Sequence, residues 1–207
     1  MLKSDYQRMA NRTECDQQRS FNRIRIHHQG TGGYDYEMST RLLHCVVGLS
    51  GEMAEIQKSD SARNLKEELG DVLWYTAQGA NAMGIVLDNN SETRTFSLDY
   101  FKNMLLCEVG NLASLVEKWL FYGQSLDFRC VRNNLNDIVG CIHNICLYYG
   151  WTVDELMEMN ISKLRQRYPE KFTEELALEV NRNREAESQV MEQNGHGWVE
   201  PKETEEG

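Results

Sequence analysis

Four acidic residues occur as two pairs with the same internal spacing, Glu52 with Glu55 and Glu68 with Asp71. Residues three apart on a helix share a face, so each pair would point in one direction. Magnesium prefers oxygen ligands such as carboxylates, and four like charges close together are costly unless a cation lies among them. The two pairs therefore predict a magnesium site and, because magnesium held by carboxylates commonly acts on phosphates, phosphate chemistry.

On a helical wheel, each acidic pair lies at the edge of the apolar stripe of its own helix. The stripe includes Cys45, Leu49 and Ile56 in the first helix and Leu65, Leu69 and Val72 in the second. The wheel turns Glu68 toward the helix bundle and its neighbour Glu67 toward water. The alternative interpretation is two amphipathic helices whose polar faces happen to be acidic. Two pairs in matching positions favour the metal site.

Composition indicates a single soluble domain with a tail. The chain has 207 residues and only two prolines, Pro169 and Pro201, which leaves long stretches for helices. No apolar run reaches the roughly 18 residues that span a bilayer, and the polar start lacks a signal peptide, so we expect no membrane partner and a cytoplasmic location. The net charge of -10 argues against a nucleic-acid partner.

The apolar periodicity and its breaks predict an all-α fold with a four-helix-bundle core built from two helix pairs in tandem, with flanking helices. We expect helices at about 39–58, 62–83, 98–121, 127–149 and 153–166. Ser39 is the predicted N-cap of the first. The predicted organisation is a helical segment and loop (1–38), the first pair and its linker (39–97), the second pair (98–179) and a charged, disordered tail (180–207).

The two helix pairs align with each other as an internal repeat. The four acidic positions of the first pair correspond in the second to Glu108, Asn111, Asn134 and Asp137, and Gly84 corresponds to Gly150. Because amides supply only dipoles where a hard dication needs anionic oxygen, we expect the second pair to bind magnesium poorly. Chance similarity between amphipathic helices is the alternative, but the matched polar positions favour duplication.

These motifs resemble the all-α NTP pyrophosphohydrolase superfamily, which includes MazG and the dimeric dUTPases. The family pattern is E-x-x-E, a spacer and E-x-x-D; here the spacer is twelve residues. The segments LLHCVVGLSGEMAEIQK, EELGDVLWY and NISKLRQRYPEKF are also similar, and the resemblance covers about residues 5–173. It implies that Glu52, Glu55, Glu68 and Asp71 are the catalytic magnesium ligands, with Mn²⁺ as a substitute. It further implies cleavage of nucleoside triphosphates between the α and β phosphates, to a monophosphate and pyrophosphate.

The same resemblance divides the family's other motifs between the two copies. The first keeps all four acids, whereas the second contains the segments KWLFYG (118–123) and NISKLRQRY (160–168). One composite site per chain follows, in a pseudo-dimer resembling the dUTPase arrangement, with a homodimer as a further arrangement. Candidate substrate-binding residues are Lys58, Trp74, Tyr75, Lys118, Asn160, Lys163, Arg167 and Tyr168. For each cation the alternative role is a solvated basic face, and for each aromatic residue it is core packing.

Two other functions stay open beside a broad nucleotide pyrophosphohydrolase. One is a pyrimidine-specific dUTPase or dCTPase, since no segment of the chain identifies the base. The other is a non-catalytic protein that binds a nucleotide or a partner, against which the intact first set of acids weighs. The identity of the general base is also open, and Glu55 is one candidate.

Overall fold

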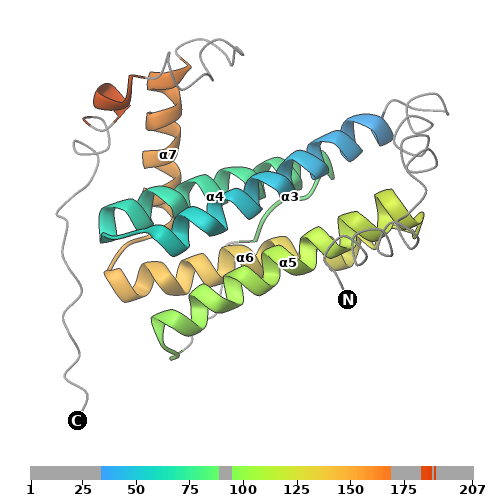
Figure 1. The fold of residues 1–207 in the computed structure, drawn as a ribbon, viewed down its shortest axis with the longest axis horizontal. Coiled ribbons are helices and arrows are strands. Elements are labelled where there is room, and N and C mark those ends of the chain that lie inside the picture. The colour runs from blue at the N-terminus through green and yellow to red at the C-terminus, as the bar shows by residue number, and fades with distance from the viewer. Residues whose placement is uncertain (1–33, 89–94, 169–182, 188, 190–207) are drawn as a thin grey trace, which may run out of the picture.

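The computed structural model describes residues 34–88, 95–168, 183–187 and 189. Over these residues the chain is helical without any strand, which confirms the predicted all-α class. The main elements are α3 (Tyr34–Lys58), α4 (Ala62–Ala82), α5 (Leu98–Tyr122), α6 (Phe128–Tyr149) and α7 (Val153–Arg167) (Figure 1). None of these helices combines the length and the apolar content that a membrane span requires.

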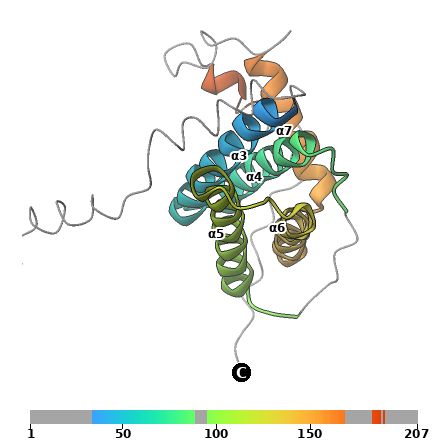
Figure 2. The ribbon, with the colours of Figure 1, turned by 90° about the vertical axis from the view of Figure 1, so that its right-hand side faces the viewer.

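The helices α3 and α4 form one pair, α5 and α6 form a second, and the two pairs pack on each other (Figures 1 and 2). The contacts between pairs run from α3 to α5 and from α4 to α6. Fully buried aliphatic side chains fill the space between them, among them Leu49, Leu69, Leu105, Leu112, Leu135, Ile138 and Ile142. Because burying each contributes roughly 1.5–3 kcal/mol, this shared core holds the four-helix bundle together within one chain.

Side-chain caps determine where most of the helices begin. Ser61 accepts a hydrogen bond from the amide of Asn64 at the start of α4, and Asp127 caps α6 in a similar way. Thr152 and Glu155 form a reciprocal capping box at the start of α7. A cap of this kind contributes about 1 kcal/mol. The bounds of α4, α5, α6 and α7 lie within one residue of those predicted.

The start of α3 differs from the prediction. The helix includes residues 34–37, which were expected to belong to a loop, and Ser39 lies inside it with only 1% of its surface exposed. Ser39 is therefore not an N-cap. The physical reason is that Met38 lies one turn before Leu42 and extends the buried apolar stripe toward the N-terminus.

The two helix pairs end in the same way. Gly84 and Gly150 follow α4 and α6 with φ angles of 63° and 71°, in the left-handed region that favours glycine. In each case the amide one residue past the glycine donates to a carbonyl oxygen in the last helical turn (Ile85 to Ala80 at 2.9 Å, Trp151 to Cys146 at 2.8 Å). This is the Schellman pattern, and it occurs at positions that correspond in the repeat alignment.

The chain that leaves each pair then crosses the second helix of the other pair. After α4, the amide of Asp88 donates to the side chain of Asn136 on α6 at 3.0 Å. After α6, the backbone of Leu156 on α7 passes close to Gly70 on α4. Asn136 and Gly70 correspond in the repeat alignment. The two pairs are thus arranged alike at these positions, and the repeat and its origin by duplication stay predictions.

Part of the predicted tail is ordered. Residues 184–187 form a helical turn, and Glu187, only 5% exposed, forms an ion pair with Arg167 of α7. The ion pair attaches this turn of the predicted tail to α7, and the disorder of the tail as a whole stays a prediction. The rest of the tail, like most of the predicted N-terminal segment, lies outside the described residues.

Candidate metal centre

Three carboxylates meet on one side of the first helix pair. One oxygen atom from each of Glu52, Glu68 and Asp71 lies within 4.8 Å of the others. Glu52 comes from α3, and the other two lie one turn apart on α4. All three side chains are half-buried. The wheel therefore placed these three of its four acids correctly.

Burial and mutual repulsion make this cluster unfavourable as a set of charges. Burial, followed by the charges of Asp71 and Glu68, raises the pKa of Glu52 to about 8, although Lys163 acts in the opposite direction. Burial and the charge of Asp71 likewise raise the pKa of Glu68 to about 7. A hard divalent cation would relieve both penalties, because it supplies positive charge and takes oxygen ligands. The donor set, three carboxylates without nitrogen or sulfur, therefore fits Mg²⁺ or Mn²⁺.

Glu55, the fourth predicted ligand, lies outside this cluster. Its side chain is 53% exposed, and its carboxylate accepts a hydrogen bond from Lys58 Nζ at 3.1 Å. Its negative charge still contributes to the raised pKa of Glu68, so it lies at the edge of the cluster. Glu55 is thus open to solvent on the side where the other three acids are half-buried.

Helix α7 supplies the partners of Asp71. Asn160 Nδ2 and Lys163 Nζ donate to the two carboxylate oxygens at 2.6 and 2.5 Å. Asp71 and Glu67 raise the pKa of the Lys163 ammonium even though burial acts to lower it. The helix comes this close because Gly70 has no side chain: a Cβ atom there would lie 3.3 Å from Asn160 Cβ. Two predicted substrate-binding residues are therefore partners of a metal-ligand candidate.

Glu67 is less exposed to water than the wheel predicts. Its carboxylate lies 3.4 Å from Lys163 Nζ, and its side chain is only 29% exposed. The helical wheel assigned core and solvent faces by considering only the packing of the four-helix bundle, without α7. Because α7 crosses α4 on its other side, the face assigned to solvent is partly covered by another helix (Figure 2).

Aromatic rings lie beside the carboxylates. Tyr75 follows Asp71 by one turn, and its ring contacts those of Trp74 and His44 edge-on, with centroid distances of 4.9 and 5.5 Å. Gly48 makes room for this ring, because a Cβ atom there would lie 2.1 Å from the Tyr75 ring. Sequence reasoning identified both α4 aromatics but missed His44. The available signal was spacing, since His44, Gly48 and Glu52 follow one another at four-residue intervals on one helical face.

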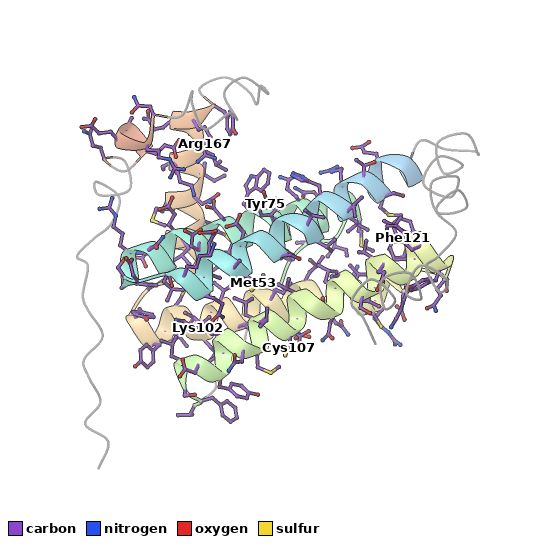
Figure 3. The ribbon with its side chains drawn as sticks, viewed as in Figure 1. Met53, Tyr75, Lys102, Cys107, Phe121 and Arg167 are labelled. Atoms are coloured by element: carbon purple, nitrogen blue, oxygen red, sulfur yellow. The ribbon has the colours of Figure 1, made fainter. Side chains whose placement is uncertain are left out.

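The other predicted substrate-binding residues divide into two groups. Arg167 and Tyr168 lie within electrostatic reach of Tyr75, whose pKa is raised first by burial and next by Glu52. Lys118 is exposed near the C-terminal end of α5. Figure 3 shows Phe121, three residues further on, at the end of the bundle remote from Arg167. The structure therefore does not bring Lys118 to the three carboxylates.

The corresponding positions of the second pair form a hydrogen-bonded group. Glu108 Oε2 accepts from Asn134 Nδ2 at 2.5 Å and from Asn111 Nδ2 at 3.3 Å. Asp137 is exposed. The side chain of Asn134 is buried, and among the described residues its Oδ1 atom has no hydrogen-bond partner. Two amide groups thus donate hydrogen bonds to Glu108, whose carboxylate is the one of this pair that points inward.

Comparison with known proteins gave one match. The family model of the MazG nucleotide pyrophosphohydrolase domain matches residues 38–93. This range contains all three clustered carboxylates and Glu55, and it ends before α5. No curated protein and no solved structure matches the chain.

Proposed function

We propose that this protein, in which residues 38–93 match the family model of the MazG nucleotide pyrophosphohydrolase domain, hydrolyses nucleoside triphosphates between the α and β phosphates in a magnesium-dependent reaction. The observation that carries the proposal is the half-buried cluster of Glu52, Glu68 and Asp71. Three carboxylates with this burial and spacing are costly unless they bind a cation. The products would be a nucleoside monophosphate and pyrophosphate.

In this proposal the three clustered carboxylates share one role and Glu55 has another. Glu52, Glu68 and Asp71 hold Mg²⁺, with Mn²⁺ as a substitute. When bound, the ion supplies charge neutralisation at the phosphate oxygens and acidification of a water molecule. Glu55 accepts the proton of the attacking water, because it lies at the edge of the cluster, is open to solvent and is close enough to influence Glu68.

Residues from α4 and α7 would bind the nucleotide around this centre. Asn160 and Lys163 orient Asp71 and add one positive charge beside the acids. Arg167 extends the same face of α7 by one turn and would contact the phosphates, for which its guanidinium is well suited. The rings of Trp74 and Tyr75, with His44 against them, offer apolar surface on which a base could stack.

A panel of ribo- and deoxyribonucleoside triphosphates, assayed with Mg²⁺ or Mn²⁺ and with product identification, tests this function. We expect monophosphate and pyrophosphate from at least one nucleotide, and no reaction with EDTA. A nucleoside diphosphate with orthophosphate would contradict the bond assignment. One strongly preferred pyrimidine would identify a dUTPase or dCTPase. Absence of turnover with every nucleotide and both metals would reject the enzyme and favour a nucleotide-binding protein.

A further inference from the structure

An ion pair attaches the C-terminal turn to the end of α7. Arg167 Nε donates to one carboxylate oxygen of Glu187 at 3.1 Å, and Arg167 Nη2 donates to the other at 2.9 Å. The two side chains are only 17% and 6% exposed. Asn183 caps this turn, since its side chain accepts from the amide of Ala186 at 3.0 Å. The capped helical turn thus holds the Glu187 carboxylate against the Arg167 guanidinium.

Arg167 belongs to the face of α7 that meets the metal centre. It follows Lys163 by four residues, which is about 6 Å along a helix axis on the same side. Lys163 donates to Asp71, so the guanidinium lies one turn beyond a partner of the carboxylate cluster. Figure 3 shows Arg167 at the projecting end of α7, on the side of the bundle where Tyr75 lies. The electrostatic influence of Arg167 on Tyr75 agrees with this placement.

A guanidinium binds a carboxylate or a phosphate through the same bidentate pair of hydrogen bonds. Glu187 therefore occupies the donor face of Arg167 that two phosphate oxygens would use. We propose that Glu187 is an internal competitor for the phosphates of the substrate, so that residues 183–187 lower the affinity of the site for phosphate anions. The ligand class, a pyrophosphate or triphosphate group, rests on the proposed function, whereas the competition itself rests on the ion pair.

Titration calorimetry with inorganic pyrophosphate and Mg²⁺, on the full chain, tests this competition. Glu187→Gln should bind pyrophosphate about tenfold more tightly than the wild type, because it removes the charge that competes for Arg167. Glu187→Ala, which also removes both acceptor oxygens, should bind at least as tightly. Glu185→Gln is the matched control: it removes an equal charge from an exposed position of the same turn and should bind as the wild type does.

The role of Arg167 is tested by Arg167→Gln, which should weaken pyrophosphate binding. In this background, adding Glu187→Gln should not change pyrophosphate binding further. Equal or weaker binding by both Glu187 variants would overturn the proposal and identify Glu187 as a residue that positions Arg167 for its ligand. Nucleotide turnover, measured in parallel, keeps the two proposals separate. Tighter pyrophosphate binding without turnover of any nucleotide would contradict only the proposed function, whereas turnover without tighter binding would contradict only the competition.

Discussion

In the pair α3–α4, three carboxylates lie within 4.8 Å of one another, and burial and repulsion raise the pKa of two of them. At the corresponding positions of α5–α6, one inward carboxylate, Glu108, accepts hydrogen bonds from Asn111 and Asn134. The two helix pairs pack in a similar way, but the negative charge of their inward-facing acids is compensated differently. In the second pair, amide donors hydrogen-bond to the Glu108 carboxylate, whereas the first pair has excess negative charge that a cation can neutralise.

The two pairs also differ in whether another helix covers their acidic residues. Helix α7 crosses α4 and brings Asn160 and Lys163 to Asp71. Asp137, the counterpart of Asp71 in the repeat alignment, is exposed on α6. The candidate metal centre therefore combines the acids of one pair with side chains of the helix that follows the other pair.

The largest expected effect comes from making the first pair like the second. Glu68→Gln places an amide at the position where α6 has Asn134. We expect kcat/KM for the preferred nucleotide to fall by on the order of a hundredfold, because the cluster loses an anionic ligand. Asp137→Asn, which changes an exposed acid of the second pair, should remain within about twofold of the wild type. Steady-state kinetics with Mg²⁺ measures both, and similar losses in the two variants would remove the distinction between the pairs.

The reverse change tests the second pair. Asn134→Glu replaces a buried amide donor by a second carboxylate beside Glu108. We expect the free energy of unfolding without metal to fall by about 2–3 kcal/mol, because a hydrogen bond to a charged group is lost and a like charge is added. Urea denaturation measures this change. Asn133→Glu, one residue away and exposed, is the control and should change it by less than about 0.5 kcal/mol. An equally stable Asn134→Glu variant would show that the amides do not balance Glu108.

The pH dependence of stability should reveal the excess charge of the first pair. The pKa values of Glu52 and Glu68 in the folded protein are about 8 and 7, above the ordinary value of 4.5. Between these values the folded state binds more protons than the unfolded state, so stability without metal should decrease as the pH rises from 4.5 to about 8.

Thermal unfolding in EDTA and in Mg²⁺ across this range measures the effect. Bound cation should raise the melting temperature most at high pH, where it no longer competes with protons. The double variant Glu52→Gln, Glu68→Gln should lose most of the pH dependence. A wild-type melting temperature that rises with pH in EDTA would contradict the assignment of repulsion to this cluster.

The smallest expected effect concerns Glu67, the weaker partner of Lys163. Glu67→Ala should lower kcat/KM by about two- to fivefold, because Lys163 keeps its shorter contact to Asp71 but loses the 3.4 Å contact to Glu67. Asn133→Ala, at the corresponding exposed position of α6, should have no measurable effect. A loss as large as that of Glu68→Gln would place Glu67 among the metal ligands.

Most of the fold follows from local sequence signals. The bounds of α4, α5, α6 and α7 were predictable because apolar periodicity, turn residues and glycines such as Gly150 act within a few residues. The start of α3 was not, because Ser39 has the residue type of an N-cap but packs inside the helix. Its role depends on tertiary contacts rather than on its neighbours in sequence.

The site was predictable as far as helical geometry reaches. Spacing placed Glu68 and Asp71 on one helical face, and Glu52 meets them from α3. Spacing also predicted Glu55 in this cluster, but its carboxylate is exposed and pairs with Lys58. Spacing failed for Glu67 because a wheel does not include a helix such as α7 that arrives from outside the bundle. It also gave no indication of the ion pair between Arg167 and Glu187, which lie twenty positions apart in the sequence.

The position of α7 in the chain has a consequence for how the protein is made. Asp71 is separated from Asn160 and Lys163 by 89 and 92 residues, and contacts across such distances form late in folding. During synthesis, α3 and α4 emerge with their acids before α7 exists, and the range matched to MazG ends before it as well. The acids of α3 and α4 are therefore made before the Lys163 ammonium that pairs with Asp71, and they receive this partner only once α7 has formed.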